Sequence, residues 1–273
     1  MAGSAFAGST VVVTGAAGGL GRAIALRFAA AGARIAALDR DETALAELAA
    51  HCEAAGIDCL AVPCDVTDAR ACAAAIAAAA ERFGRIDVLV NNAGLSHRSA
   101  LAQTAPAVIR KVVEVNFFGA VHCTQAALPH LLASRGLIVV ISSVAGFAPL
   151  IARTGYAASK HALHGFFDSL RSELAPEGVG VTLVCPSFVD TGIERHALGA
   201  DGGPARHART VTGERATPEA VADQVYLAAS KRQRLLLVGR TARLAWWVSR
   251  IAPAMYERMM AKRLRAELDA ARR

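Results

Sequence analysis

The sequence is poor in aromatic and in charged residues. Phe, Trp and Tyr make up 5% of the 273 residues and Asp, Glu, Lys and Arg make up 19%, whereas 54% are hydrophobic. This balance excludes a disordered chain and indicates a globular protein. A chain of this length can bury a sizeable core, and α/β folds of this size commonly form one domain.

Paired metal-ligand spacings are also missing. None of the six cysteines stands in a Cys-x-x-Cys pair, and His161 and His164 have no third ligand nearby in the sequence. We therefore predict that the protein holds no metal. The cysteines lie in apolar or helical surroundings, which favours buried thiols in a reducing compartment. They are Cys52, Cys59, Cys64, Cys72, Cys123 and Cys185.

The sequence has no long uncharged apolar run that would suit a membrane span. The longest candidate, residues 136–152, is interrupted by serines, a glycine and a proline. The apolar stretch at residues 10–14 is only strand-length and has no basic segment before it, unlike a signal peptide. These absences predict a cytoplasmic protein.

An excess of positive charge is missing except at the end of the chain. The net charge is +7, yet residues 231–273 carry 12 Lys/Arg against 3 Asp/Glu, and the preceding residues carry 18 against 20. A nucleic-acid-binding protein would place its basic residues on the folded body, so no nucleic-acid partner is predicted. A basic helical tail instead favours an acidic partner or peripheral contact with a membrane surface.

Short apolar runs alternate with longer helical stretches along the chain. Such a pattern predicts a doubly wound, Rossmann-like α/β fold with a parallel seven-stranded sheet covered on both faces. The expected strands are residues 10–14, 33–39, 58–65, 86–94, 136–143, 180–186 and 234–239. The expected helices are residues 21–31, 41–55, 69–82, 105–115, 117–134 and 156–175. Residues 1–240 would form a dinucleotide-binding and catalytic domain, and residues 241–273 a helical tail, divided at Pro253, that packs on or beside it.

A glycine-rich segment, TGAAGGLG, joins the first expected strand to the first helix. Gly15 would permit the tight turn, Gly19 the approach of a pyrophosphate, and Gly21 the packing of the helix against the sheet. Asp39 ends the second strand, where a carboxylate can accept hydrogen bonds from the adenosine ribose and repel a 2′-phosphate. This favours NAD, although the adjacent Arg40 leaves NADP open.

Tyr156 and Lys160 lie four residues apart on an expected helix and so share one face. A nearby ammonium favours the phenolate, so the pair can exchange a proton with an alcohol or a ketone. A Tyr-x-x-x-Lys pair is common by chance, and its surroundings decide the interpretation. Ser143 would end the fifth strand and could orient a substrate oxygen. Asn116 interrupts a helical region, where a kink or a buried carbonyl could hold a water that connects to Lys160.

Taken together, these segments resemble the short-chain dehydrogenase/reductase family over residues 10–191. The resemblance rests on the order and spacing of TGAAGGLG, CDVTD, NNAG, Asn116, Ser143, YAASK and Pro186. It implies that Tyr156 is the general acid/base, that Lys160 lowers its pKa and binds the nicotinamide ribose, that Ser143 polarises the carbonyl and that Asn116 anchors a proton relay. The cofactor-binding residues that it implies are Gly15, Gly19, Leu20, Gly21, Asp39, Arg40, Asp65, Val66, Asn92, Ala93, Gly94, Tyr156, Lys160, Pro186, Val189 and Thr191.

The sequence departs from the family pattern at two places. Pro186 is followed by Ser187 where a glycine is usual, and the seventh strand leads into the long tail. The loop at residues 192–215 would cover the substrate, and the Trp- and Met-rich tail would cap the pocket or join subunits.

We predict an oxidoreductase that acts on an apolar secondary alcohol or ketone. A 3-oxoacyl thioester reductase is the main alternative, and a dinucleotide-binding regulator without turnover is an alternative of another class. Family members are often dimers or tetramers, so a homodimer or homotetramer is expected.

Overall fold

The fold is a seven-stranded parallel sheet with the strand order β3-β2-β1-β4-β5-β6-β7. The structure is a computed structural model, and it describes residues 5–190, 197–205, 215–263, 265 and 269. The strands are β1 (Thr10–Thr14), β2 (Arg34–Asp39), β3 (Cys59–Pro63), β4 (Val88–Asn91), β5 (Leu137–Ile141), β6 (Gly180–Pro186) and β7 (Leu235–Val238). The order reverses between β1 and β4, and the predicted doubly wound fold is confirmed.

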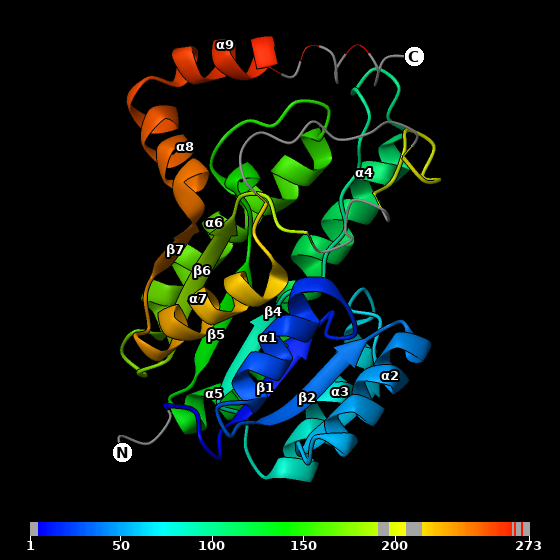
Figure 1. The fold of residues 1–273 in the computed structure, drawn as a ribbon, viewed down its shortest axis with the longest axis vertical. Coiled ribbons are helices and arrows are strands. Elements are labelled where there is room, and N and C mark those ends of the chain that lie inside the picture. The colour runs from blue at the N-terminus through cyan, green and yellow to red at the C-terminus, as the bar shows by residue number, and fades with distance from the viewer. Residues whose placement is uncertain (1–4, 191–196, 206–214, 264, 266–268, 270–273) are drawn as a thin grey trace.

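Helices follow the strands in the predicted alternation (Figure 1). They are α1 (Gly19–Ala29), α2 (Glu42–Ala54), α3 (Ala69–Phe83), α4 (Pro106–Val113), α5 (Gly119–Ser134), α6 (Thr154–Leu174), α7 (Pro218–Ser230), α8 (Gly239–Ile251) and α9 (Pro253–Arg263). A π-helical turn, Glu114–Phe118, joins α4 to α5, and a short 3₁₀ helix, Val144–Gly146, follows β5.

Alternate residues of the buried strands point into two separate cores. In β1, Val11 and Val13 join the core that α1, α2 and α7 cover, whereas Val12 joins the core under α3, α5 and α6. Both cores consist of fully buried aliphatic side chains and a few aromatic ones, such as Phe28 and Phe167. Covering both faces explains why the strands read as continuous apolar runs rather than alternating ones.

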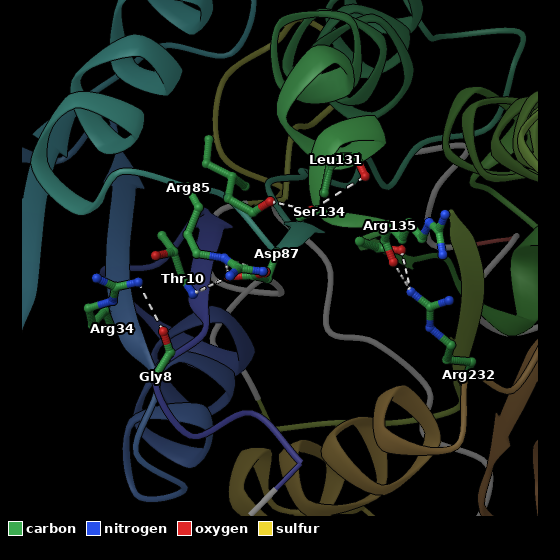
Figure 2. Close-up of polar contacts among 11 residues, drawn as sticks. Gly8, Thr10, Arg34, Arg85, Asp87, Leu131, Ser134, Arg135 and Arg232 are labelled. Carbon is green, nitrogen blue, oxygen red and sulfur yellow. Dashed lines mark hydrogen bonds and ion pairs between the residues drawn. The ribbon is translucent and has the colours of Figure 1, made fainter. Parts of the chain in front are cut away.

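Side-chain contacts stabilise the end of the sheet at which the strands begin (Figure 2). Asp87 accepts a hydrogen bond of 2.9 Å from Thr10 N and pairs with Arg85. Arg232 donates to the carbonyl oxygens of Arg135 and Gly136, the second at 2.7 Å. This edge is therefore held by structural contacts, and the glycine turn and the site residues gather at the opposite edge, where the strands end.

Helix α7 was missed by the sequence analysis. Its signals are local: Thr217 accepts a hydrogen bond of 3.2 Å from Ala220 N, and Pro218 occupies the first helical position. A capping threonine followed by proline is typical of a helix start. The expected strands at residues 86–94 and 136–143 are shorter in the structure, because the chain turns after Asn91 and after Ile141.

The tail forms two helices that meet at Pro253, as the sequence predicts (Figure 1). Ala245 of α8 and Tyr256 of α9 pack with Ala148 of the segment after β5 in a small apolar cluster. Within the part of the chain that the structure describes, no helix is both long enough and apolar enough to cross a membrane.

Candidate active site

The glycine turn after β1 needs glycine for two different physical reasons. Gly15 and Gly19 have φ angles of +63° and +52°, a region that favours glycine. At Gly21 the reason is space, since a Cβ there would lie 1.9 Å from Gly15 O. The sequence predicts that Gly21 packs on the sheet, but its close partner is the turn itself. Leu20 is buried in the first turn of α1, which has no acidic residue and no side-chain cap, so its amides suit an anion.

Asn92 and Ala93 brace this turn from the neighbouring strand. Asn92 Nδ2 donates to Thr14 O at 2.9 Å and to Gly15 O at 3.0 Å. Thr14 Oγ1 accepts from the amides of Asn92 and Ala93, both at 3.0 Å. A pair of residues that the resemblance assigns to the cofactor thus also fixes the shape of the turn that would receive the phosphates.

Asp39 lies over the glycine turn at the end of β2. Its carboxylate accepts hydrogen bonds from Ala17 N at 2.9 Å and from Asp41 N at 3.1 Å. These bonds hold a negative charge beside the turn, and the adjacent Arg40 is exposed. A carboxylate at this point would disfavour the negative charge of a 2′-phosphate on the adenosine ribose.

Asp65 and Val66 follow β3 on the same side of the sheet. Hydrogen bonds from Thr67 to Asp65, and then the charges of Arg40 and Lys111, lower the pKa of that carboxyl. Val66 lies against Gly119, where a Cβ would come within 2.6 Å of Val66 Cγ2. Glycine at the start of α5 therefore allows the helix to approach this segment closely.

Tyr156 and Lys160 lie on one face of α6, as predicted, and they differ in exposure. Lys160 is buried and Tyr156 is half-buried. Lys160 Nζ donates a hydrogen bond of 2.8 Å to Ile141 O at the end of β5 and lies 5.7 Å from the centre of the Tyr156 ring. Burial lowers the pKa of Lys160 to about 8. The arrangement can place a cation beside a phenol whose hydroxyl exchanges a proton with a ligand.

Asn116 lies in the π-helical turn between α4 and α5, which confirms a local irregularity at this position. Its side chain is buried and bonds to both backbone groups of Leu95, at 2.8 Å and 3.0 Å, and to Ser159 Oγ at 2.9 Å. Gly94 lies between Asn116 and Lys160, because a Cβ there would be 3.2 Å from Asn116 Oδ1 and 3.7 Å from Lys160 Nζ. The two side chains are thus brought to one small region beside Gly94.

Ser143 lies two residues beyond the end of β5, and the prediction that it ends the strand is wrong. The strand pairs with β6 only as far as Ile141, and Ser143 Oγ then accepts a hydrogen bond of 3.2 Å from Ala145 N. Capping of the 3₁₀ turn fixes the serine in the lining of a pocket. The other lining residues are mostly apolar and come from three segments: Val144, Ala145, Pro149, Leu150, Ser187, Phe188, Thr241, Leu244, Ala245, Val248, Tyr256, Met259 and Met260.

The segment after β6 supports the pocket at its start. Pro186 ends β6, Ser187 lines the pocket, and Val189 pairs with Ala216 through an isolated bridge. Thr191 and most of the loop at residues 192–215 lie outside the described residues.

All six cysteines are free, five of them buried and Cys59 half-buried. Among the described residues, no three His, Cys, Asp or Glu side chains gather in a way that could hold a metal.

Comparison with known proteins identifies the family. A family model described as short chain dehydrogenase matches residues 9–200. The protein named dehydrogenase/reductase SDR family member 7B from Bos taurus is 40% identical over 268 residues, which cover 95% of this chain and 82% of that relative. The chain belongs to the short-chain dehydrogenase/reductase family. A short-chain dehydrogenase/reductase from Burkholderia phymatum, solved in complex with NAD, superposes with a TM-score of 0.80 at 27% identity over 92% of this chain and 95% of that one.

Membership of the short-chain dehydrogenase/reductase family makes the chain an oxidoreductase with a nicotinamide cofactor. The residues present fit such a group. The first turn of α1 offers uncapped amides, Asp39 stands beside them, and Gly94 leaves open the space that a Cβ would fill between Asn116 and Lys160.

His97 supports the site and was missed by the sequence analysis. It is fully buried, and its Nε2 accepts a hydrogen bond of 2.9 Å from Gly155 N, the amide that precedes Tyr156 in α6. Arg153, the residue before the helix, provides no side-chain cap. His97 therefore caps the helix from 58 residues away. Burial, together with the charge of Arg153, lowers the pKa of His97 to about 4, so the ring stays neutral and able to accept. The sequence signal that could have identified His97 is its position three residues after the NNAG segment.

Replacing Gly21 with alanine should destabilise the protein even without cofactor. The new Cβ would meet Gly15 O at 1.9 Å, and relieving that overlap should cost about 2 kcal/mol or more. Gly18→Ala is the matched control, because a Cβ at Gly18 has nothing within 4 Å and its φ of −146° suits alanine. Thermal unfolding of both variants checks this, and equal stability of the two would contradict it.

The stability of the protein should depend on pH through Lys160. Its pKa is lowered from 10.5 to about 8 in the folded state, so the unfolded chain binds more protons between these values. The free energy of unfolding should therefore rise across this window by up to about 3 kcal/mol relative to Lys160→Met. Denaturant unfolding of both proteins at pH 7 and pH 10 measures the difference. A difference that does not change with pH would refute the lowered pKa of Lys160.

Replacing His97 with leucine should remove the cap of α6 and leave Gly155 N without its acceptor. The expected cost is about 1–3 kcal/mol of stability, with a fall in kcat larger than any rise in KM. His97→Gln places an amide oxygen near the position of Nε2 and should restore most of both. Unfolding and steady-state kinetics check this, and a glutamine variant no better than leucine would show that the ring acts through its packing alone.

Proposed function

We propose that this chain transfers a hydride between NAD and an apolar secondary alcohol or ketone. The observation that carries the proposal is the buried Lys160 beside Tyr156, held at the carboxyl end of the sheet next to Gly94 and Asn116. A surface Tyr-x-x-x-Lys pair would leave the lysine in water. A buried ammonium is costly, which indicates a task that depends on its charge.

Each polar side chain then has a defined role. Tyr156 gives a proton to the ketone oxygen and becomes the phenolate, or as the phenolate takes a proton from the alcohol. The Lys160 ammonium favours the phenolate in both directions. Ser143, which lines the pocket, holds the substrate oxygen. Asn116 keeps the π-helical turn in place. The i→i+5 backbone hydrogen bonding of such a turn is frequent at functional sites and suits a proton relay toward Lys160. When bound, the nicotinamide supplies or accepts the hydride.

The cofactor preference follows from Asp39. Its carboxylate is held over the glycine turn by Ala17 N and Asp41 N, where it can accept from ribose hydroxyls and repels a 2′-phosphate. Hydrogen bonds from Thr67 are the main cause of the lowered pKa of Asp65, and the positive charge of Arg40 lowers it further. The charge of Arg40 therefore acts on the Asp65 carboxylate. NAD is therefore preferred over NADP.

The substrate class follows from the pocket that contains Ser143. Its walls include Leu150, Leu244, Val248, Met259 and Met260, so the tail supplies much of an apolar lining. Methionine adapts to irregular ligands, which suits a flexible hydrocarbon chain or a ring system. The protein is proposed to act as a homodimer or homotetramer.

Cofactor titration followed by a substrate screen tests the proposal. We expect NADH to be bound more tightly than NADPH, and absorbance at 340 nm to report turnover of apolar ketones. Tyr156→Phe should lower kcat by about 10²–10⁴-fold, because the general acid is lost. Tyr226→Phe is the matched control, since Tyr226 of α7 packs against Phe6 and Phe28, away from the site.

Other outcomes would assign a different function. Turnover confined to 3-oxoacyl thioesters would make the protein an acyl reductase. Tight NADH binding without turnover of any alcohol or ketone would indicate a dinucleotide-binding regulator. Unchanged kcat in Tyr156→Phe would contradict the catalytic assignment.

A further inference from the structure

The tail helices carry an apolar face that nothing in the described structure covers. Leu244, Trp247 and Ile251 of α8 are 62%, 62% and 76% exposed, and Met255 at the start of α9 is 58% exposed. The three α8 residues have i, i+3, i+7 spacing and so form one stripe, on the side away from the buried Ala242 and Ala245. We call the stripe together with Met255 the outer face.

The outer face is concentrated rather than scattered. Four of the eight strongly exposed large apolar side chains among the described residues lie within these twelve positions. The others, Leu101, Phe118, Leu132 and Leu227, come from separate elements. Figure 1 shows α8 and α9 at one end of the molecule, where they extend beyond β7 and turn across the top of the view. An apolar surface gathered at a projecting end suits contact with another apolar phase.

Positive charge surrounds the outer face. Helices α8 and α9 carry six Lys/Arg against one Glu, in contrast to the slightly acidic body of the chain. The exposed cations of these two helices include Arg240, Arg243, Arg250, Arg258 and Lys262. In a symmetric contact between two copies, these like charges would face each other and repel. An anionic surface neutralises them, and a tryptophan among apolar residues with flanking arginines suits a lipid headgroup region.

The outer face is continuous with the pocket that contains Ser143. Leu244 belongs to both, since it lines the pocket and is also 62% exposed. Val248, Met259 and Met260 continue the apolar lining inward from there. An apolar molecule at the outer face would thus reach the pocket along side chains of the same two helices.

We propose that the outer face docks on an anionic phospholipid bilayer and that the substrate enters the pocket from the lipid phase. The second half rests on the proposed function, whereas the docking does not. Each basic group near an anionic surface strengthens binding by about fivefold, so the five exposed cations make docking dependent on both anionic lipid and salt.

Vesicle binding of the full chain tests the docking without any substrate. We expect the protein to sediment with vesicles of 70% phosphatidylcholine and 30% phosphatidylserine, and much less with phosphatidylcholine alone or in 0.5 M NaCl. Trp247→Ser combined with Ile251→Ser should weaken binding at least tenfold. The matched control is Leu101→Ser combined with Leu227→Ser, which removes exposed apolar side chains of other elements and should leave binding unchanged.

Tryptophan fluorescence reports the contact directly, because Trp246 and Trp247 are the two tryptophans of the chain. Trp246 is half-buried and packs between Phe147 and Arg250, so Trp246→Phe leaves Trp247 as the probe. Its emission should shift to the blue on addition of the phosphatidylserine vesicles. No shift, or equal binding of the Trp247/Ile251 double variant, would overturn the proposal. Lipid-independent self-association that this variant abolishes would assign the face to a second copy.

Activity measurements separate docking from catalysis. The Trp247/Ile251 double variant should reduce a small water-soluble ketone at the parent rate and lose turnover of a vesicle-borne apolar ketone, and detergent should restore it. Equal rates for the vesicle-borne ketone would refute entry from the lipid. Failure of every variant and the parent on all ketones would refute the proposed function, while the sedimentation result would still decide the docking.

Discussion

The buried ammonium group of Lys160 is the constraint on which the candidate site depends. Removed from water, it needs an acceptor, and the carbonyl of Ile141 at the end of β5 provides one. The turn at Gly94 and the side chain of Asn116 come close to the same group. Three segments far apart in the sequence are thus drawn to one point, and a bulkier residue at position 94 would separate them.

The neighbours of this cation are kept neutral by the same burial that surrounds it. Burial lowers the pKa of His164, one turn further along α6, to about 4, and raises the pKa of Cys185 to about 12. Neither His164 nor Cys185 therefore adds a charge beside Lys160 near neutral pH. Lys160 is therefore the cation beside Tyr156, which suits a group whose charge tunes a phenol.

The tail gives the family fold a second apolar surface. One side of α8 packs on the segment after β5, and the opposite side carries Leu244, Trp247 and Ile251. A helix that is apolar on two sides needs a second apolar environment, and its arginines restrict which kind. The pocket wall and the proposed docking face are consequently parts of the same two helices.

The local sequence determined the sheet, the glycine turn and the shared helix face of Tyr156 and Lys160. Each of these rests on a short-range pattern, such as apolar runs, glycine at a turn or a four-residue spacing. Helix α7 was equally readable from Thr217 and Pro218, and it was missed although its signal was local.

Only the tertiary structure decided the contacts that join distant segments. Asn92 braces a turn 77 residues away, His97 caps a helix 58 residues away, and Asn116 bonds to Ser159 across 43 residues. The exact place of Ser143, beyond the strand rather than at its end, was decided by where pairing with β6 stops. These features depend on how side chains meet in three dimensions, and local periodicity carries no information about such meetings.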